Sequence, residues 1–272
     1  MTMKVAVLQM TSGSDMAVNI IAFESMVRDA AAAGAYLIAS PENSDLMGLD
    51  VTEKVARVCL ETDHPMISLC ESLAQELGVW ISLGSIAIKA SAQKFYNRSY
   101  LFSPAGKVVA SYNKIHLFDV DLPSGEIRRE SKGVEAGDQM VVAHTDFSDV
   151  GLSICYDVRF PQIYRKMAQA GAGVLFIPAA FTVSTGQMHW EVLLRARAIE
   201  NGAFVIAAAQ CGDHGHDRKT YGHAMIVNPW GEILAEAGEV PEIIYANLDL
   251  DEVRRARGAI ASLTHNIVIF KY

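Results

Sequence analysis

The chain has 272 residues, of which 51% are hydrophobic and 20% are charged, and its formal net charge is −8 at pH 7. This composition is typical of a soluble globular protein and excludes collagen-like, coiled-coil and disordered chains. An acidic chain without a basic stripe repels phosphate backbones, so we expect no nucleic-acid partner. Its apolar stretches, such as 203–209, are shorter than the roughly 20 residues that cross a bilayer, so we expect no membrane partner either.

The N-terminus and the cysteines indicate the compartment. The first ten residues carry a short apolar run that ends at Gln9 without a small-residue cleavage site, which favours a first strand over a secretory signal. The four cysteines lie far apart and form no CxxC pair; they are Cys59, Cys70, Cys155 and Cys211. Unpaired cysteines are typical of a reducing compartment, so we predict a cytoplasmic protein.

The predicted elements of the first half alternate strands with helices. Runs rich in Val and Ile predict strands, and apolar residues at helical spacing predict helices. In chain order these are a strand at 5–10, a helix at 17–33, a strand at 35–39, a helix at 66–77 and a strand at 79–83. Gly34 and Gly78 follow the two helices, as expected of residues that end a helix. A hairpin comes next, with strands at 97–102 and 107–112 around a turn that contains Pro and Gly.

The second half continues the alternation and ends in another hairpin. Its predicted elements are a strand at 150–154, a helix at 161–170, a strand at 174–177, a helix at 189–201, a strand at 203–209 and hairpin strands at 224–227 and 232–235. No linker, charge block or fixed-period repeat divides the chain. The sequence therefore predicts a single α/β domain over residues 1–272, built of mixed sheets that helices cover.

Cys155 is the first candidate for chemistry. It follows the predicted strand at 150–154 and precedes a turn that leads into the helix beginning at Pro161. Such a strand-to-helix elbow exposes a nucleophile at the edge of a sheet and turns backbone N–H groups toward a developing oxyanion. The alternative is a small buried side chain, because free cysteines commonly belong to the core.

Three charged positions accompany this cysteine. Glu42 follows a predicted strand, where a carboxylate could act as a general base; its alternative is a solvated loop residue. Lys114 leaves a strand among apolar neighbours, where an ammonium would stabilise a thiolate and an oxyanion; its alternative is a surface pair with Asp119. Glu130 lies in a charged stretch whose simplest interpretation is a solvated loop. A nucleophilic cysteine needs a base and an oxyanion stabiliser, and the chain offers both types at strand ends.

These positions fall in segments that resemble the signature motifs of the nitrilase superfamily of carbon–nitrogen hydrolases. The segments are Pro41-Glu42, Lys114-Ile115-His116-Leu117-Phe118-Asp119 and Cys155-Tyr156-Asp157-Val158-Arg159-Phe160-Pro161. They occur in the order found in the family, with Glu130 where the family carries a second carboxylate, and the resemblance spans nearly the whole chain. It implies a four-layer α-β-β-α sandwich of two mixed β-sheets covered by helices, assembled into homodimers or larger homo-oligomers.

The same resemblance implies a catalytic set of Glu42, Lys114 and Cys155. Glu42 is expected to take the thiol proton as Cys155 attacks an amide carbon, while Lys114 and the backbone N–H of Tyr156 hold the oxyanion. Loss of the amine leaves a thioester, which water activated by Glu42 hydrolyses. Glu130 is expected to orient Lys114 and the substrate amide. This chemistry needs no metal and no organic cofactor, and we predict neither.

Later segments are similar to the branch of the superfamily that contains deaminated-glutathione amidase and ω-amidase; they are 181–186, 207–212 and 221–223. This similarity implies a small amide substrate with a 2-oxoglutaramyl group, first of all deaminated glutathione. An ω-amidase that acts on 2-oxoglutaramate, a nitrilase or an N-carbamoyl amidohydrolase is the alternative. We expect Arg159 to bind the substrate carboxylate and Tyr156, Phe181 and Thr185 to contact the substrate. The alternative for Arg159 is an ion pair with Asp157.

Overall fold

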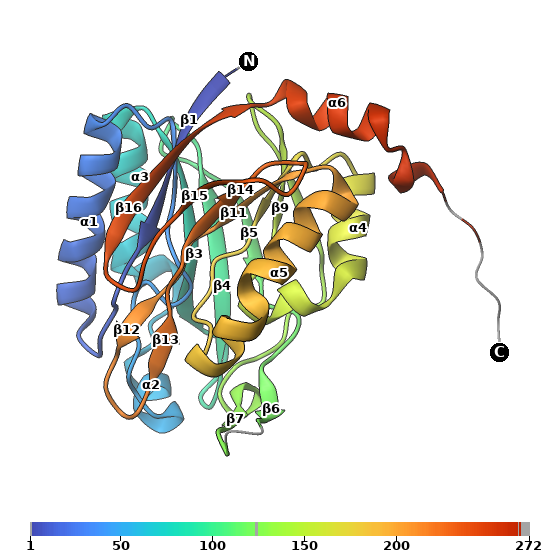
Figure 1. The fold of residues 1–272 in the computed structure, drawn as a ribbon. Helices are drawn as coiled ribbons and strands as arrows, with labels where there is room; N and C mark the ends of the chain where they lie inside the picture. The colour runs from blue at the N-terminus through green and yellow to red at the C-terminus, as the bar shows by residue number, and fades with distance from the viewer. Residues whose placement is uncertain (1, 123–124, 266, 268–272) are drawn as a thin grey trace.

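Two six-stranded mixed sheets form the centre of the molecule (Figure 1). The computed structural model describes residues 2–122, 125–265 and 267. The strands of the first sheet lie in the order β16 (Glu242–Asp249), β1 (Thr2–Gln9), β2 (Leu37–Ala39), β3 (Trp80–Lys89), β4 (Phe95–Phe102) and β5 (Val108–Asn113). Those of the second lie in the order β15 (Ile233–Glu236), β14 (Met225–Val227), β11 (Phe204–Ala207), β10 (Val174–Phe176), β9 (Asp149–Leu152) and β8 (Val141–His144).

Helices cover the outer faces of the two sheets. Figure 1 shows α1 and α3 on one side of the molecule and α4 and α5 on the other, with the sheets between them. The α-helices are α1 (Met16–Ala32), α2 (Val51–Arg57), α3 (Pro65–Leu77), α4 (Pro161–Gln169), α5 (Val183–Asn201) and α6 (Asp251–Ala259). This order of layers confirms the predicted α-β-β-α sandwich. Within the described ranges, no helix is both long enough and apolar enough to span a bilayer.

Smaller elements lie at the edges of the sandwich. Two short hairpins stand apart from the main sheets: β6 (Asp119–Asp121) with β7 (Ile127–Arg129), and β12 (Cys211–Asp213) with β13 (Lys219–Tyr221). Four 3₁₀ turns connect the larger elements: η1 (Glu61–Asp63), η2 (Glu130–Lys132), η3 (Cys155–Arg159) and η4 (Ser262–Thr264). Two of these turns, η2 and η3, begin at residues predicted to take part in chemistry.

The side-chain alternation of β1 shows how one strand serves two hydrophobic layers. Val5 and Val7 are fully buried in the core between the sheets, which also contains Val150 from the second sheet. Ala6 and Leu8 point the other way, into the layer between the first sheet and its helices. Because successive side chains of a strand alternate between faces, the covered middle of this strand is apolar on both faces.

Both sheets have the same arrangement of parallel and antiparallel strands, although β16 comes from the C-terminal end of the chain and β8 directly precedes β9. In each, three parallel strands are joined through helices: β1, β2 and β3 through α1 and α3, and β9, β10 and β11 through α4 and α5. Two antiparallel strands then extend one edge, β4 and β5 in the first sheet and β14 and β15 in the second. One antiparallel strand closes the other edge, β16 or β8. The two sheets therefore repeat one arrangement of strands.

Local sequence signals account for most element boundaries. The Asp15 carboxylate accepts hydrogen bonds from the backbone N–H groups of Ala17 and Val18 and so begins α1. Gly78 ends α3 at φ 66°, in the left-handed region that glycine adopts easily. The structure extends two predictions: β3 continues to Lys89, and α5 begins six residues before the predicted 189.

The early start of α5 has a packing reason. Its first turns contain Gly186, which favours neither helix nor strand in a sequence pattern. In the structure a side chain at this glycine would lie only 2.3 Å from the ring of Tyr221, so the close contact of α5 with β13 requires glycine. Sequence periodicity alone does not reveal this contact.

Candidate active site

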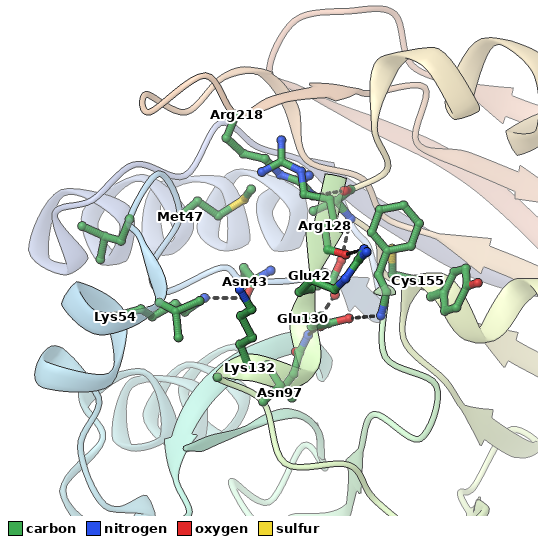
Figure 2. A pocket seen from close by; sticks show the side chains of 18 of the residues that line it. Glu42, Asn43, Met47, Lys54, Asn97, Arg128, Glu130, Lys132, Cys155 and Arg218 are labelled. Carbon is green, nitrogen blue, oxygen red and sulfur yellow. Dashed lines mark hydrogen bonds between the residues drawn. The ribbon is translucent and has the colours of Figure 1, made fainter. Parts of the chain in front are cut away.

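The three residues of the proposed catalytic set meet at one cavity. Glu42 follows β2, Lys114 follows β5, and Cys155 follows β9. All three line a cavity of about 480 Å³, which is within the usual range for small-molecule sites. Figure 2 shows the charged groups of Glu42 and Glu130 facing the same space as Cys155. Residues from both sheets therefore converge where the sheets meet.

Lys114 joins two carboxylates in the buried part of the site. Its Nζ lies 2.9 Å from Oε1 of Glu42 and 2.9 Å from Oε1 of Glu130. Lys114 is 2% exposed and Glu42 3% exposed. The structure thus rules out the solvated-loop alternative for Glu42 and the surface pair of Lys114 with Asp119. Glu130 is half-buried and also accepts the backbone N–H of Phe118 at 2.6 Å.

Asn97 completes this network from β4. Its side-chain amide donates to Oε1 of Glu42 at 2.8 Å and to Oε1 of Glu130 at 3.3 Å. The other oxygen of Glu42 accepts the backbone N–H of Ala180 at 2.8 Å. Sequence reasoning missed Asn97 as a site residue, because it lies in a strand with other polar residues, Arg98 and Ser99, and nothing in the local pattern distinguishes it.

Burial and neighbouring charges have opposite effects on the pKa values of Glu42 and Lys114. Burial disfavours the ionised form of Glu42, but the charge and hydrogen bonds of Lys114, with the hydrogen bond from Asn97, hold the pKa of Glu42 below its usual value. Burial likewise disfavours the Lys114 ammonium, yet the charges of Glu130 and Glu42 raise the pKa of Lys114 well above its usual value. Glu42 is therefore a carboxylate at neutral pH and is able to accept a proton.

Cys155 occupies a strained elbow. Its φ is 49°, a conformation that non-glycine residues rarely adopt, and its backbone N–H donates to the carbonyl of Pro178 at 2.8 Å. Burial and the negative charge of Glu42 raise the pKa of the Cys155 thiol, and the opposing charge of Lys114 does not outweigh them. The resting group is therefore a thiol. This differs from the expectation that Lys114 stabilises a thiolate, because two carboxylates already neutralise that lysine.

Asp157 links the second and third motifs. Its fully buried carboxylate accepts hydrogen bonds from the Tyr112 hydroxyl at 2.7 Å and from the backbone N–H of His116 at 3.1 Å. It also accepts the backbone N–H of Ile154 at 2.8 Å. The ring of His116 in turn stacks on Phe160, with centroids 3.6 Å apart. These contacts tie the segment that carries Lys114 to the segment that carries Cys155.

We expect Lys114→Met to destabilise the protein strongly. The substitution leaves Glu42 and Glu130 facing each other without a cation, and breaking a buried ion pair in this way costs about 3–5 kcal/mol. Urea unfolding at pH 7 measures the loss, and the exposed Lys89→Met serves as a matched control. The deficit should shrink as pH falls, because protonation removes the unpaired carboxylate charge. A variant as stable as the control would show that the lysine does not hold the two carboxylates.

The structure separates the predicted substrate contacts into two groups. Tyr156, Phe181 and Thr185 line the cavity. Arg159 does not; its guanidinium lies over the rings of Phe181 and Tyr156, at 5.3 and 5.9 Å, and 3.3 Å from Nδ1 of His189. Among the described residues, Arg159 forms no ion pair with Asp157 either. The ion-pair alternative is therefore wrong, and the contact of Arg159 with a substrate carboxylate stays a prediction.

Several cavity residues were not predicted from the sequence. The ammonium of Lys54 in α2 donates to Oδ1 of Asn43 at 2.7 Å and to the carbonyl of Leu46 at 2.8 Å. Arg128 and Arg218 line the cavity from two separate hairpins. Both lie in charged stretches of the sequence, which are typical of a solvated surface. In the described parts of the chain, no cluster of three or more His, Cys, Asp or Glu side chains could hold a metal ion.

Comparison with known proteins gives consistent results. The carbon–nitrogen hydrolase family model matches residues 4–258. The chain is 43% identical to the deaminated glutathione amidase of a Synechocystis strain over 97% of this chain and 98% of that protein. The crystal structure of the NitFhit protein of C. elegans matches with a TM-score of 0.89 and 37% identity, over 97% of this chain and 65% of that one.

A third match concerns an active site. It is a mutant of the amidase from Nesterenkonia sp. AN1 whose active-site cysteine carries the product of Michael addition of acrylamide. The TM-score is 0.80 with 26% identity, over 95% of this chain and 98% of that one. Family model, sequence relatives and solved structures agree over almost the entire length. The chain therefore belongs to the carbon–nitrogen hydrolase family of the nitrilase superfamily, as its three motifs predicted.

Proposed function

We propose that the protein is a thiol amidohydrolase that cleaves deaminated glutathione through a thioester on Cys155. The observation that carries the proposal is the contact of one buried lysine, Lys114, with two carboxylates beside Cys155 in a cavity of small-molecule size. The 43% identity to a deaminated glutathione amidase supports the choice of substrate. The scissile bond is the amide between the 2-oxoglutaryl group and cysteinylglycine.

Acylation begins with proton transfer. Glu42 accepts the thiol proton while the Cys155 sulfur bonds to the amide carbon, so that the thiolate forms only as it attacks. The carbonyl electrons move to oxygen, and this oxyanion is held by Lys114 and by the backbone N–H of Tyr156, in the first turn of η3. Glu42 returns the proton to the amide nitrogen, the C–N bond breaks and cysteinylglycine leaves.

Deacylation repeats these roles with water as the nucleophile. Glu42 removes a proton from a water molecule, whose oxygen attacks the thioester carbon and forms a second oxyanion in the same place. The C–S bond then breaks, Glu42 returns the proton to sulfur, and 2-oxoglutarate leaves. Glu130 keeps Lys114 in position throughout and contributes an acceptor for the substrate N–H. No group outside the chain and its substrates takes part in these steps.

A product assay tests this function. The purified protein and its Cys155→Ala variant are given deaminated glutathione, 2-oxoglutaramate and an aliphatic nitrile in parallel, and products are identified by mass spectrometry. Release of cysteinylglycine by the parent protein alone supports the proposal. Preferential release of ammonia from 2-oxoglutaramate would instead indicate an ω-amidase, and acid formation from the nitrile a nitrilase. No product from deaminated glutathione would overturn the assignment of substrate.

We also propose that the protein forms a homodimer or a larger homo-oligomer in the cytoplasm. Four free cysteines in the described chain support a reducing compartment, and fractionation of source cells tests it. Exposed apolar side chains on α5 support self-association. Met188 is 64%, Val192 67% and Ile199 52% exposed. Trp230, which lies beside them in the folded chain, is 50% exposed. Exposed apolar residues clustered in this way are typical of interfaces.

We expect light scattering to give a mass at least twice the 29.6 kDa of one chain. Val192→Glu should reduce that mass to a single chain, because it places a charge in the apolar surface. Val18→Glu on α1, at a site 60% exposed, is the matched control and should leave the mass unchanged. A parent protein of monomer mass would contradict self-association, and an unaffected Val192→Glu would place the interface elsewhere.

A further inference from the structure

The cavity wall is basic although the chain is acidic overall. Three acidic residues line it, Glu42, Asp50 and Glu130, against six basic ones: Lys54, Lys114, Arg128, Arg129, Lys132 and Arg218. Lys114 is matched by its two carboxylates, and the guanidinium of Arg129 is held by Asp121, with both contacts at 2.8 Å. The remaining positive charge faces the cavity in a protein whose net charge is −8.

Arg128 and Arg218 are brought together from distant parts of the chain. Arg128 belongs to β7, and Arg218 directly precedes β13. Nε of Arg128 donates to Oε1 of Glu126 at 2.7 Å, and Nη1 of Arg218 lies 3.8 Å from the same oxygen. Figure 2 shows both side chains on one side of the cavity, above Glu42 in this view. Glu126, which does not line the cavity, thus lies between the two guanidinium groups.

The two guanidinium groups repel each other and have donors left for a further anion. The two side chains are 33% and 20% exposed, so water screens their repulsion only partly. Burial and the charge of Arg128 lower the pKa of Arg218. Each guanidinium has five N–H groups, and the hydrogen bonds above, with one from Arg218 to the carbonyl of Ala180, use a minority of them. Donors suited to a carboxylate are therefore present.

The pair is also connected to the reacting centre. Nη2 of Arg218 donates to the carbonyl of Ala180 at 2.8 Å, and the N–H of Ala180 donates to Glu42 at 2.8 Å. An anion held by the arginines therefore lies in the same cavity as the bond to be cleaved. Arg159, in contrast, does not line the cavity.

We propose that Arg128 and Arg218 form a subsite that binds a carboxylate of the amide substrate. The inference rests on the proposed amidase function and deepens it, because it explains how an amidase selects an anionic substrate. Deaminated glutathione carries one carboxylate on the 2-oxoglutaryl side of the amide and one on its terminal glycine. Both offer the same chemistry to a pair of guanidinium groups, and substrate variants distinguish them.

Steady-state kinetics of Arg128→Gln and Arg218→Gln test the subsite. We expect each to raise KM for deaminated glutathione about 10- to 100-fold, the range for a lost charge-assisted hydrogen bond, with kcat nearly unchanged. The exposed Arg28→Gln removes the same charge outside the cavity and should have no effect. Arg128→Lys and Arg218→Lys keep the charge without the two-pronged geometry and should give intermediate values of KM.

Two further substrates identify the carboxylate. One is deaminated glutathione whose terminal carboxylate is amidated, and the other is 2-oxoglutaramate. If the terminal carboxylate is bound, amidation raises KM in the parent protein, and the arginine variants add little to that rise. If the 2-oxoglutaryl carboxylate is bound, the variants raise KM for all three substrates alike. Unchanged KM for every substrate, or a loss of kcat alone, would overturn the subsite.

A binding measurement separates failure of the subsite from failure of the proposed function. Glutarate, a dicarboxylate, is titrated calorimetrically into the Cys155→Ala protein with and without Arg218→Gln, and the neutral diamide glutaramide is the control. We expect glutarate binding to weaken about 10- to 100-fold on loss of the arginine. Such weakening without turnover of any amide would overturn the proposed function and keep the subsite. If the amide is turned over but neither KM nor glutarate binding depends on the arginine, the subsite is overturned and the proposed function stands.

Discussion

Cys155→Ala is expected to lower kcat for deaminated glutathione by about 10⁶-fold, the loss found when a nucleophile is removed from a covalent mechanism. The substitution deletes only the sulfur that forms the thioester. Alanine and cysteine meet the same backbone restriction at φ 49°, so the fold should be retained. None of Cys59, Cys70 and Cys211 lines the cavity, so no other thiol can replace the lost one.

Intact-protein mass spectrometry after rapid acid quenching provides the second readout. The parent protein should carry a 2-oxoglutaryl group, and peptide mapping should place it on Cys155. The variant should carry none at the same time point. Cys211→Ala is the matched control and should acylate and turn over like the parent. Acylation at another residue, or turnover by Cys155→Ala near that of the parent, would contradict the thioester mechanism.

Glu42→Gln is expected to reduce kcat by about 10²- to 10⁴-fold, the usual contribution of a general acid–base group. Glutamine has nearly the same shape but cannot take the thiol proton, and the raised pKa of Cys155 leaves little thiolate without that base. Because the base acts in both halves of the reaction, acylation and deacylation should slow together. Single-turnover kinetics with quenching measures the two steps separately.

The stability of the Glu42→Gln variant must be measured together with its loss of kcat. Both oxygens of Glu42 accept hydrogen bonds, from Lys114 and Asn97 on one and from Ala180 on the other, so the amide NH₂ of glutamine meets a donor in either orientation. We expect a lower melting temperature but a native circular dichroism spectrum at the assay temperature. Glu76→Gln, at an exposed ion pair with Arg28, is the control. A folded Glu42→Gln protein with parental kcat would exclude Glu42 as the base.

The meeting of the candidate catalytic residues could be predicted because each follows a strand and lies in a recognisable motif, whereas their catalytic roles stay a prediction. Glu42, Lys114 and Cys155 all meet at the cavity, where the sequence placed them only at separate strand ends. The function of Asp157 within its motif becomes clear only in the structure, because its partners Tyr112 and His116 are more than 40 residues away. The motifs identify the candidate residues, but only the fold shows which of these residues are in contact.

Other features could not be predicted for equally physical reasons. Strand β16 pairs with β1 from the opposite end of the chain, and no local pattern indicates such a partner. The arginines that line the cavity could not be predicted for a similar reason. Arg159 is close to Cys155 in sequence but outside the cavity, whereas Arg128 and Arg218 are distant in sequence and line it. Proximity along the chain does not predict which side chains face the cavity, because a turn reverses the direction of side chains.

The shared strand arrangement of the two sheets has a consequence for how the proposed chemistry is distributed. In the proposed mechanism the proton acceptor Glu42 and the cation Lys114 follow strands of the first sheet, and the sulfur of Cys155 follows a strand of the second. The two sheets therefore share an architecture but differ in the reacting groups that follow their strands. Neither sheet carries the complete proposed set, so we expect the reaction to depend on the packing of the two sheets against each other.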